Sequence, residues 1–381
     1  MRVLGLVVEY NPFHTGHLYH INKAKEMVNP DVTIVIMSGN FVQRGEVAII
    51  DKFKRSEIAI KHGIDLVIEL PFVYVNQSAD YFCHGAIRLL NEIGCTDIVF
   101  GSENGDIEVF KDIAITIENN QEQYNNLIKE NMNNGLRYPD ACNQALSSLM
   151  NKTVTTPNDL LGLGYVKEVI NHHYPINIDC FKRTNDYHDL DLDKISSASS
   201  LRVALKKHQD VSTYLLNEDY YQELSFNDDF FEILRYRILL STNEQLKRIH
   251  LVDEGIENLL IKNILEYDNM NDFVDSLTSR RYTKPRIQRM LINVLMDNSK
   301  QEINNCLDVD YLRVLKMNDT GRNYLNKIKK DLNFKLVTTY SSYQHPSLSL
   351  ELKAAKLLAC LHNDLDIIKK EYRNIPFRNN D

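Results

Sequence analysis

The first 180 residues alternate short apolar runs with helical patterns. The apolar runs cover residues 3–8, 32–37, 64–70, 96–101 and 176–181, and they are rich in Val and Ile without polar alternation. Strands that are buried on both faces have this pattern. Between two of them, residues 78–94 place apolar side chains at helical spacing, from a Ser that can cap the helix to a Gly that can end it. Strand–helix alternation predicts a parallel sheet with right-handed crossovers.

After about residue 190 the pattern becomes mainly helical. Helical spacing covers residues 199–208, 227–240, 243–250, 254–267, 284–296, 321–331 and 348–360, and only residues 334–339 have a strand pattern. We therefore predict an α/β fold in which a parallel-sheet domain, residues 1–190, is followed by a mainly α-helical domain, residues 191–381. Ligands of parallel sheets bind at the carboxyl ends of the strands, so these ends are where functional side chains are expected.

Composition narrows the class of protein. The 381 residues include 43% hydrophobic and 25% charged residues, which is ordinary for a globular protein, and the net charge of -8 argues against a wholly basic nucleic-acid binder. The six cysteines are scattered without Cys-x-x-Cys spacing, so we expect neither a zinc site built on cysteines nor a disulfide framework. The scattered cysteines fit a reducing cytoplasm, and because no apolar stretch reaches about 18 residues, we expect no membrane span.

The segment NPFHTGH, residues 11–17, follows the first predicted strand directly. A helix that begins here offers free N–H groups and a positive dipole end, which suit a phosphate. Gly16 allows close backbone approach, and His14 and His17 can both point at one phosphate. Imidazoles in this position favour nucleotidyl transfer, in which a nucleophile attacks the α-phosphate of a nucleotide. The alternative is a His-rich loop at an ordinary helix start.

The segment ISSASSLR, residues 195–202, is a second candidate phosphate site. It is a Ser-rich turn that opens a helix, and its Ser197, Ser199 and Arg202 can bind and neutralise a leaving pyrophosphate. A Ser-rich N-cap is also a common way to start a helix, so the alternative here is a purely structural turn.

Together the two segments resemble the HxGH nucleotidyltransferase superfamily, although Ala198 departs from its usual Ile-Ser-Ser-Thr-x-Ile-Arg motif. A closer resemblance extends over nearly the whole chain. The segments GLVVEYNPFHTGHLYHI, SGNFVQRGEVAIIDKFKRSEIAI, GSENGD, TPNDLLGLGY, RTNDYHD and RRYTKPRIQRML resemble the bacterial tRNA(Met) cytidine acetate ligase family. This resemblance implies a Rossmann-like nucleotidyltransferase domain of the HUP type. It also implies a ligase that makes acetyl-adenylate from acetate and ATP and then acetylates N4 of the wobble cytidine of elongator tRNA(Met).

The resemblance also implies which residues bind ATP. With the serine-rich turn, the expected set comprises Val7, Val8, Glu9, Tyr10, Asn11, Pro12, Phe13, His14, Thr15, Gly16, His17, Leu18, His20, Gly101, Asn158, Arg183, Ser197, Ser199 and Arg202. Asn158 can instead be a helix N-cap, and Arg183 a solvated surface residue. Mg²⁺ is expected only with the ATP phosphates. The acidic segment at residues 184–193 is interpreted as a linker, so no protein-bound metal is expected.

Residues 38–55 are predicted to form a long loop at the end of the second strand. We interpret it as a lid over acetate and ATP, with Asn40, Gln43, Arg44 and Lys52 as its polar contacts and Arg44 or Lys52 facing anions. The alternative is a solvated loop whose charges bind nothing specific.

Two basic segments indicate where RNA binds. Residues 278–290 have five basic residues and no acid, and residues 312–330 have six against Asp319. In the first, Arg286 and Arg289 are predicted to face outward from the helix, and Tyr282 can stack on a base. The predicted tRNA contacts are Arg280, Arg281, Tyr282, Lys284, Arg286 and Arg289. A charge run can also be a plain solvated face.

Two other functions remain open at this point. One is a nucleotidyltransferase that joins a nucleotide to a small phosphorylated metabolite, and the other is a non-catalytic RNA-binding protein that retains a nucleotide fold. No protein partner is implied.

Overall fold

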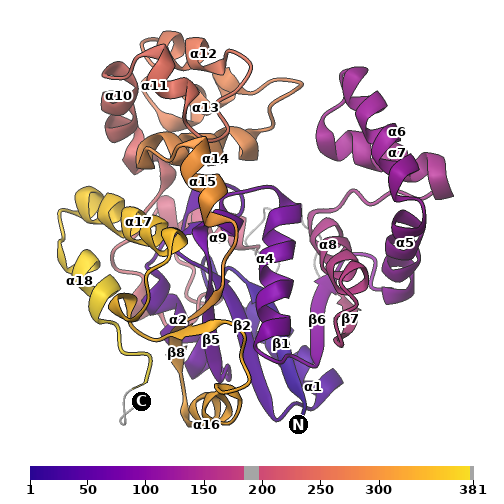
Figure 1. The fold of residues 1–381 in the computed structure, drawn as a ribbon. Coiled ribbons are helices and arrows are strands. Elements are labelled where there is room, and N and C mark those ends of the chain that lie inside the picture. The colour runs from indigo at the N-terminus through magenta and orange to yellow at the C-terminus, as the bar shows by residue number, and fades with distance from the viewer. Residues whose placement is uncertain (184–196, 378–381) are drawn as a thin grey trace.

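The computed structural model describes residues 1–183 and 197–377 (Figure 1), and the predicted α/β fold is confirmed. A seven-stranded sheet has the order β7-β6-β1-β2-β5-β8-β9, and a two-stranded hairpin pairs β3 with β4. The strands are β1 Val3–Val8, β2 Val32–Ser38, β3 Phe41–Val42, β4 Glu46–Val47, β5 Leu66–Leu70, β6 Asp97–Ser102, β7 Asn177–Lys182, β8 Tyr311–Met317 and β9 Lys335–Val337.

The helices surround this sheet. They are α1 Thr15–Val28, α2 Lys52–Lys61, α3 Phe72–Val75, α4 Ala79–Glu92, α5 Ile107–Asn119, α6 Gln121–Asn133, α7 Tyr138–Met150, α8 Pro157–Asn171 and α9 Ala198–Lys206. They continue as α10 Phe231–Leu239, α11 Asn243–Lys247, α12 Ile256–Asn263, α13 Met270–Leu277, α14 Lys284–Met296, α15 Lys300–Cys306, α16 Asp319–Ile328, α17 Pro346–His362 and α18 Asp366–Arg373. Short 3₁₀ turns lie at Glu218–Tyr220, Asn227–Phe230 and Tyr340–Ser342.

Alternating side chains of the central strands build two separate cores. Leu4, Leu6 and Val8 of β1 pack on one face with α1 and α2, whereas Ile34 and Ile36 of β2 pack on the other face. The pairs β7-β6, β6-β1, β1-β2 and β2-β5 are all parallel, with Val3 opposite Val32. Their carboxyl ends therefore lie at one edge, where the first helix begins.

Two strands of the second half complete the same sheet. The strand pattern at 334–339 is confirmed as β9, but β8 was not predicted, and it pairs antiparallel with β5. Because the side chains of Arg313 and Lys316 are buried in β8, only part of the segment 312–330 can form the predicted basic patch, and its exposed basic residues begin at Arg322 on α16. The predicted division into residues 1–190 and 191–381 is thus not a division of the sheet, and its boundary lies outside the described residues.

The helices of both halves lie on different sides of the sheet. In Figure 1, α10–α14 gather beyond the upper end of the sheet, α16 lies at the opposite end, and α5–α7 form an arm to one side. Over residues 1–183 and 197–377, no helix combines the length and the apolar character that crossing a bilayer requires.

Candidate active site

The turn between β1 and α1 is fixed by contacts from distant segments. Tyr10 has a φ of 51°, and the Asn11–Pro12 peptide bond is cis. The Asn11 side-chain oxygen accepts a hydrogen bond from the Ile49 N–H at 2.8 Å, and the Phe13 N–H donates to the Tyr221 hydroxyl at 3.0 Å. Since Phe13 is fully buried, this turn is anchored in the core while its two histidines remain at the surface of a cavity.

His14 and His17 cap the start of α1 reciprocally. His14 Nδ1 accepts from the Gly16 N–H at 3.0 Å, and His17 Nδ1 accepts from the His14 N–H at 3.3 Å. A side chain at Gly16 would lie 2.7 Å from the His14 ring, so only glycine lets the ring fold back. Because both Nδ1 atoms accept, these contacts assign the ring proton to Nε2 in each imidazole. The two rings, whose centroids are 3.9 Å apart, each retain one N–H donor for a ligand.

The imidazoles at this turn are neutral near pH 7. Burial, with smaller effects of Arg183 and Arg202, lowers the pKa of His14 to about 4. Burial also lowers the pKa of His20 to about 4 and that of His17 well below its usual value. Without a bound ligand, both rings therefore act as neutral hydrogen-bond donors rather than as cations.

These lowered pKa values predict acid sensitivity of the free protein. The unfolded chain, in which histidine titrates near its ordinary value of 6.5, binds protons that the folded chain excludes down to about pH 4 at His14 and His20. Stability is therefore complete above pH 6.5, and between pH 6.5 and pH 5 each of these imidazoles should remove up to about 2 kcal/mol from the free energy of unfolding. Urea unfolding at pH 7 and pH 5 measures this loss. The loss of stability should be smaller in the double variant His14→Asn/His20→Asn. An unchanged loss in this variant would argue against the lowered pKa values of the two histidines.

The serine-rich turn lies next to the histidine turn. Ser197 caps α9 by accepting from the Ser200 N–H at 3.2 Å. The Arg202 guanidinium donates to the Asn11 carbonyl at 2.9 Å and to Glu46 Oε2 at 2.9 Å, so one side chain ties the two segments together. The sequence-based expectation that residues 197–202 and 11–17 converge is consistent with this geometry.

One cavity of about 280 Å³ collects most of the predicted ATP-binding residues. Those that line it are Val7, Val8, Glu9, Tyr10, Asn11, His14, Gly16, His17, His20, Gly101, Asn158, Arg183, Ser197, Ser199 and Arg202, together with Gln43 and Arg44 of the predicted lid. The lining also includes residues that the sequence did not indicate: Val42, Glu46, Phe82, Phe100, Pro157, Leu161, Tyr165 and Ala198. The lining thus combines polar side chains, among them the histidines, with the aromatic rings of Phe100 and Tyr165.

Four residues of the predicted ATP-binding stretch do not line this cavity. Pro12, Phe13, Thr15 and Leu18 lie outside its lining, and Phe13 is part of the core beneath. Asn158 is not the helix cap, because Thr156 occupies that position, and its side chain instead donates to Glu103 Oε1 at 2.6 Å.

The segment 38–55 is not the long loop that the sequence predicted. It forms the β3–β4 hairpin and then α2, which begins at Lys52. The hairpin turn contacts the cavity because the Gln43 N–H donates to Glu9 Oε1 at 2.7 Å, and burial raises the pKa of the Glu9 carboxyl. Asn40 is buried behind the hairpin, where its carbonyl accepts from the Ala48 N–H.

Arg55 of α2 fixes the strand ends that form the cavity. Its fully buried guanidinium donates to the carbonyls of Glu9, at 2.6 Å, and Ser38, at 3.1 Å, and also to that of Gly39. These carbonyls end β1 and β2, so Arg55 holds the two strands in register where the ligand is expected.

Lys52 does not face an anion in the cavity, and this prediction was wrong. Its ammonium group is fully buried and contacts Glu69 Oε1 at 2.6 Å and Glu371 Oε1 at 2.8 Å. Arg313 joins the same cluster through Glu69 Oε2 at 2.9 Å, and Glu351 lies 3.8 Å from Lys52. Burial and the neighbouring Glu69 raise the pKa of Glu351 well above its usual range, so this carboxyl is held neutral.

The basic segment at 278–290 faces the solvent only in part. Arg281 pairs with Glu254 at 2.8 Å and Lys284 with Asp275 at 2.8 Å, and all four side chains are exposed. The Arg286 guanidinium lies over the ring of Tyr282, 4.2 Å from its centroid.

Arg289 does not face outward as predicted. Its guanidinium donates to the Gln43 carbonyl at 3.1 Å, and the Arg289 backbone lies against Gly45. This residue therefore connects α14 to the hairpin turn that borders the cavity.

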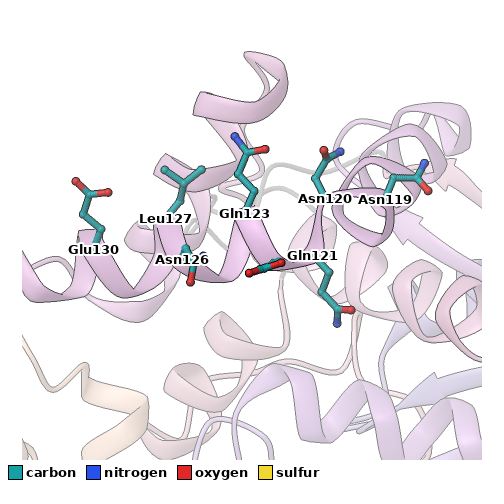
Figure 2. Close-up of a pocket in the computed structure, with 8 residues that line it drawn as sticks. Asn119, Asn120, Gln121, Gln123, Asn126, Leu127 and Glu130 are labelled. Carbon is teal, nitrogen blue, oxygen red and sulfur yellow. The ribbon is translucent and has the colours of Figure 1, made fainter.

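A second hollow, of about 500 Å³, is larger but is a poor candidate for the site. Figure 2 shows its side chains along α6 and at the turn that leads into α6 from α5. It is lined by Asn119, Asn120, Gln121, Glu122, Gln123, Asn126, Leu127 and Glu130, none of which can offset the charge of a triphosphate. We therefore place the candidate site in the smaller cavity.

Comparison with known proteins covers the whole chain. A family model described as HIGH Nucleotidyl Transferase matches residues 1–373. The tRNA(Met) cytidine acetate ligase of Bacillus subtilis is 37% identical over an alignment of 406 residues, gaps included, which covers 99% of this chain and 97% of that protein. The protein of the same name from Thermosipho melanesiensis is 37% identical, spanning 90% of this chain and 86% of its own.

Solved structures give the same result. A crystal structure of Thermotoga maritima TmcAL bound with alpha-thio ATP has a TM-score of 0.88 and 28% identity, and covers 99% of both chains. Its apo form has a TM-score of 0.90 and 29% identity over the same share. The similarity therefore includes the helical second half as well as the nucleotide-binding half.

Proposed function

Because this chain belongs to the tRNA(Met) cytidine acetate ligases, within the HIGH nucleotidyltransferases, we propose that its cavity carries out an ATP-dependent acetylation of tRNA in two steps. First, a carboxylate oxygen of acetate attacks the α-phosphorus of ATP, the bond to the β-phosphate oxygen breaks, and pyrophosphate leaves. Second, N4 of the wobble cytidine of elongator tRNA(Met) attacks the acetyl carbonyl, AMP leaves and N4 loses a proton. A cytosine amine is a poor nucleophile, which is why the acyl group must be activated.

The observation that supports this proposal is the convergence of the histidine turn and the α9 turn on one cavity. The Nε2–H groups of His14 and His17 can donate to α-phosphate oxygens, and such fixed donors stabilise the charge that develops during displacement. Arg183, Arg202 and the start of α9 offer positive charge for the departing pyrophosphate. In this proposal His14 and His17 are the catalytic residues.

The apolar side chains of the lining suit the adenine base. Phe100, Leu161 and Tyr165 provide flat or aliphatic surface, and the amide of Asn158 offers both a donor and an acceptor. Gln43 and Arg44 lie on the wall formed by the β3–β4 turn, where we place acetate. Among the other residues that the sequence predicted to bind ATP, we propose this role only for those that line the cavity.

Mg²⁺ is proposed to arrive with the ATP phosphates rather than on a protein ligand set. The carboxylates that line the cavity already have partners, since Glu9 accepts from Gln43 and Glu46 pairs with Arg202. Mg²⁺ commonly keeps several waters and few protein ligands in nucleotide sites. With tRNA as substrate, we also place the protein in the cytoplasm.

The tRNA is proposed to bind the α14 side of the molecule, above the carboxyl ends of the strands (Figure 1). Arg280, Arg281, Tyr282, Lys284 and Arg286 lie at or before the start of α14, on the same side as the hairpin turn that Arg289 contacts. A phosphate backbone on this side would bring a flipped-out cytidine toward the cavity.

Arginine variants separate RNA binding from adenylate formation. Arg280→Glu/Arg281→Glu should weaken tRNA binding by about tenfold or more, because it reverses two charges, and should leave acetate-dependent exchange of pyrophosphate into ATP unchanged. Arg289→Glu should impair both, since it also breaks the contact with Gln43. Lys327→Glu, on α16 at the opposite end of the sheet, is the matched control. Normal tRNA binding by the double variant would exclude this face.

The function itself is tested by incubating the protein with ATP, labelled acetate and elongator tRNA(Met). We expect label in N4-acetylcytidine and release of AMP and pyrophosphate. A nucleotidyltransferase acting on a phosphorylated metabolite would leave the RNA unlabelled, and a non-catalytic RNA-binding protein would consume no ATP. Either result would overturn the proposal.

A further inference from the structure

A histidine–glutamate–histidine cluster lies outside the cavity, on the two helices that form its aromatic wall. His84 comes from α4, and Glu168 and His172 come from successive turns of α8. Over the residues that the structure describes, these three side chains form the one group whose ligand atoms all lie within 4.8 Å of one another. The resemblance and the predicted ATP chemistry assign no role to them.

We propose that His84, Glu168 and His172 form a binding site for a divalent transition-metal ion of the Zn²⁺ class. Two imidazole nitrogens and one carboxylate oxygen are a ligand set that Zn²⁺ takes in proteins, with water in the fourth position. The cluster is partly exposed, so an ion can reach it and a water can complete its shell.

The spacing of the ligand atoms fits this proposal. His84 Nδ1 lies 2.9 Å and His172 Nε2 lies 3.3 Å from Glu168 Oε2. Tetrahedral ligands with bonds of about 2.0 to 2.1 Å are separated by roughly 3.3 Å, so two edges of the tetrahedron already have about the right length. The third pair of ligand atoms, the two imidazole nitrogens, lies within 4.8 Å.

The packing of α4 on α8 holds the ligands in place. The backbone at Gly164 approaches Cys83 so closely that a side chain there would lie 2.5 Å from the Cys83 sulfur. Cys83 is adjacent to His84, and Gly164 lies one turn before Glu168, so this contact fixes the distance between the ligand-bearing turns. His172 is in addition the C-cap of α8, where the helix dipole favours a cation.

An ion in this position would connect two helices that line the cavity. Phe82 of α4 lies two residues before His84, and Tyr165 of α8 lies three residues before Glu168. The site would therefore stiffen the aromatic wall without touching a nucleotide. Since it needs no ATP, its test is independent of the proposed function.

The test is a Zn²⁺ titration of the full-length, untagged protein after removal of metals with a chelator. Calorimetry should give one ion per chain, and excess Zn²⁺ should raise the melting temperature by at least about 2 °C. Co²⁺ in place of Zn²⁺ should give the visible absorption of a tetrahedral site. His84→Asn, Glu168→Gln and His172→Asn should each weaken Zn²⁺ binding by at least about tenfold.

Two controls separate this site from other ligands. His173→Asn removes the exposed neighbour of His172, and His188→Asn removes the histidine of the acidic segment, so both should leave Zn²⁺ affinity unchanged. Circular dichroism checks that each variant folds, which is expected because the ligands are partly exposed. The absence of one-to-one binding at micromolar Zn²⁺ would overturn the proposal. So would binding that survives all three ligand substitutions, since the rings would then simply be hydrogen-bonding neighbours of Glu168.

Discussion

Replacing His17 with Asn should lower acetate-dependent exchange of pyrophosphate into ATP by about 100- to 1,000-fold. Removal of one fixed donor to a developing oxyanion in a water-poor site typically has an effect of this size. Asn can still accept the His14 N–H that His17 Nδ1 now accepts, so the start of α1 should survive. The loss would then report the missing Nε2–H donor rather than a frayed helix.

The matched variants make this result specific. His14→Asn should lose activity to a similar degree while still capping Gly16, because Asn is among the best N-cap residues. His173→Asn replaces an exposed histidine with a φ of 51°, a conformation that Asn tolerates, and should exchange normally. If His17→Asn kept more than about a third of the exchange rate, the paired imidazoles would not be the groups that bind the phosphates.

Replacing Lys52 with Met should lower the free energy of unfolding by about 3 to 5 kcal/mol. The ammonium group is fully buried and contacts both Glu69 and Glu371, so its removal leaves buried carboxylates with Arg313 as their remaining cation. Breaking a buried ion pair from one side typically costs this much, because the stranded charge cannot be hydrated. Denaturant unfolding followed by circular dichroism measures the change.

Two further substitutions test the charge count of this cluster. Glu351→Gln should cost less than about 1 kcal/mol, since the raised pKa keeps this carboxyl neutral and Gln can still accept the Phe72 N–H. Lys54→Met, on the same helix but partly exposed, should have little effect. Equal losses for Lys52→Met and Lys54→Met would mean that the buried cluster does not contribute to stability.

The sheet was largely predictable because its central strands depend on local pattern. β1, β2, β5 and β6 are mainly apolar, whereas β7 (NIDCFK) mixes apolar and polar residues, and each prediction lies within two residues of the observed bounds. β8 was not predicted, because Arg313 and Lys316 interrupt its apolar pattern. The buried charge of Arg313 becomes tolerable only because Glu69 and Glu371 approach it from elsewhere in the chain, and no local pattern reports that.

The candidate site, like the sheet, was predictable from the sequence only in part. Family membership, expected from the motifs, is confirmed, and His14, His17 and Arg202 were found because they lie in short motifs. Glu46 and Tyr165 line the cavity because the β3–β4 hairpin and α8 bring them there, and although both lie in segments that carry the family resemblance, the sequence assigned neither a role. Lys52 was assigned to the cavity by its place near the second strand, but its ammonium group contacts Glu69 and also Glu371, which lies 319 residues away. The roles of the lining residues stay predictions.

The late position of Glu371 has a consequence for biosynthesis. Lys52 and Glu69 leave the ribosome long before Glu371, which follows Lys52 by 319 residues, so at ordinary elongation rates about 15 to 60 seconds separate them. During that interval the nascent chain lacks one of the carboxylates that its interior requires. A polypeptide released before α18 is translated would keep an uncompensated positive charge inside, which would expose truncated products to degradation by cellular proteases.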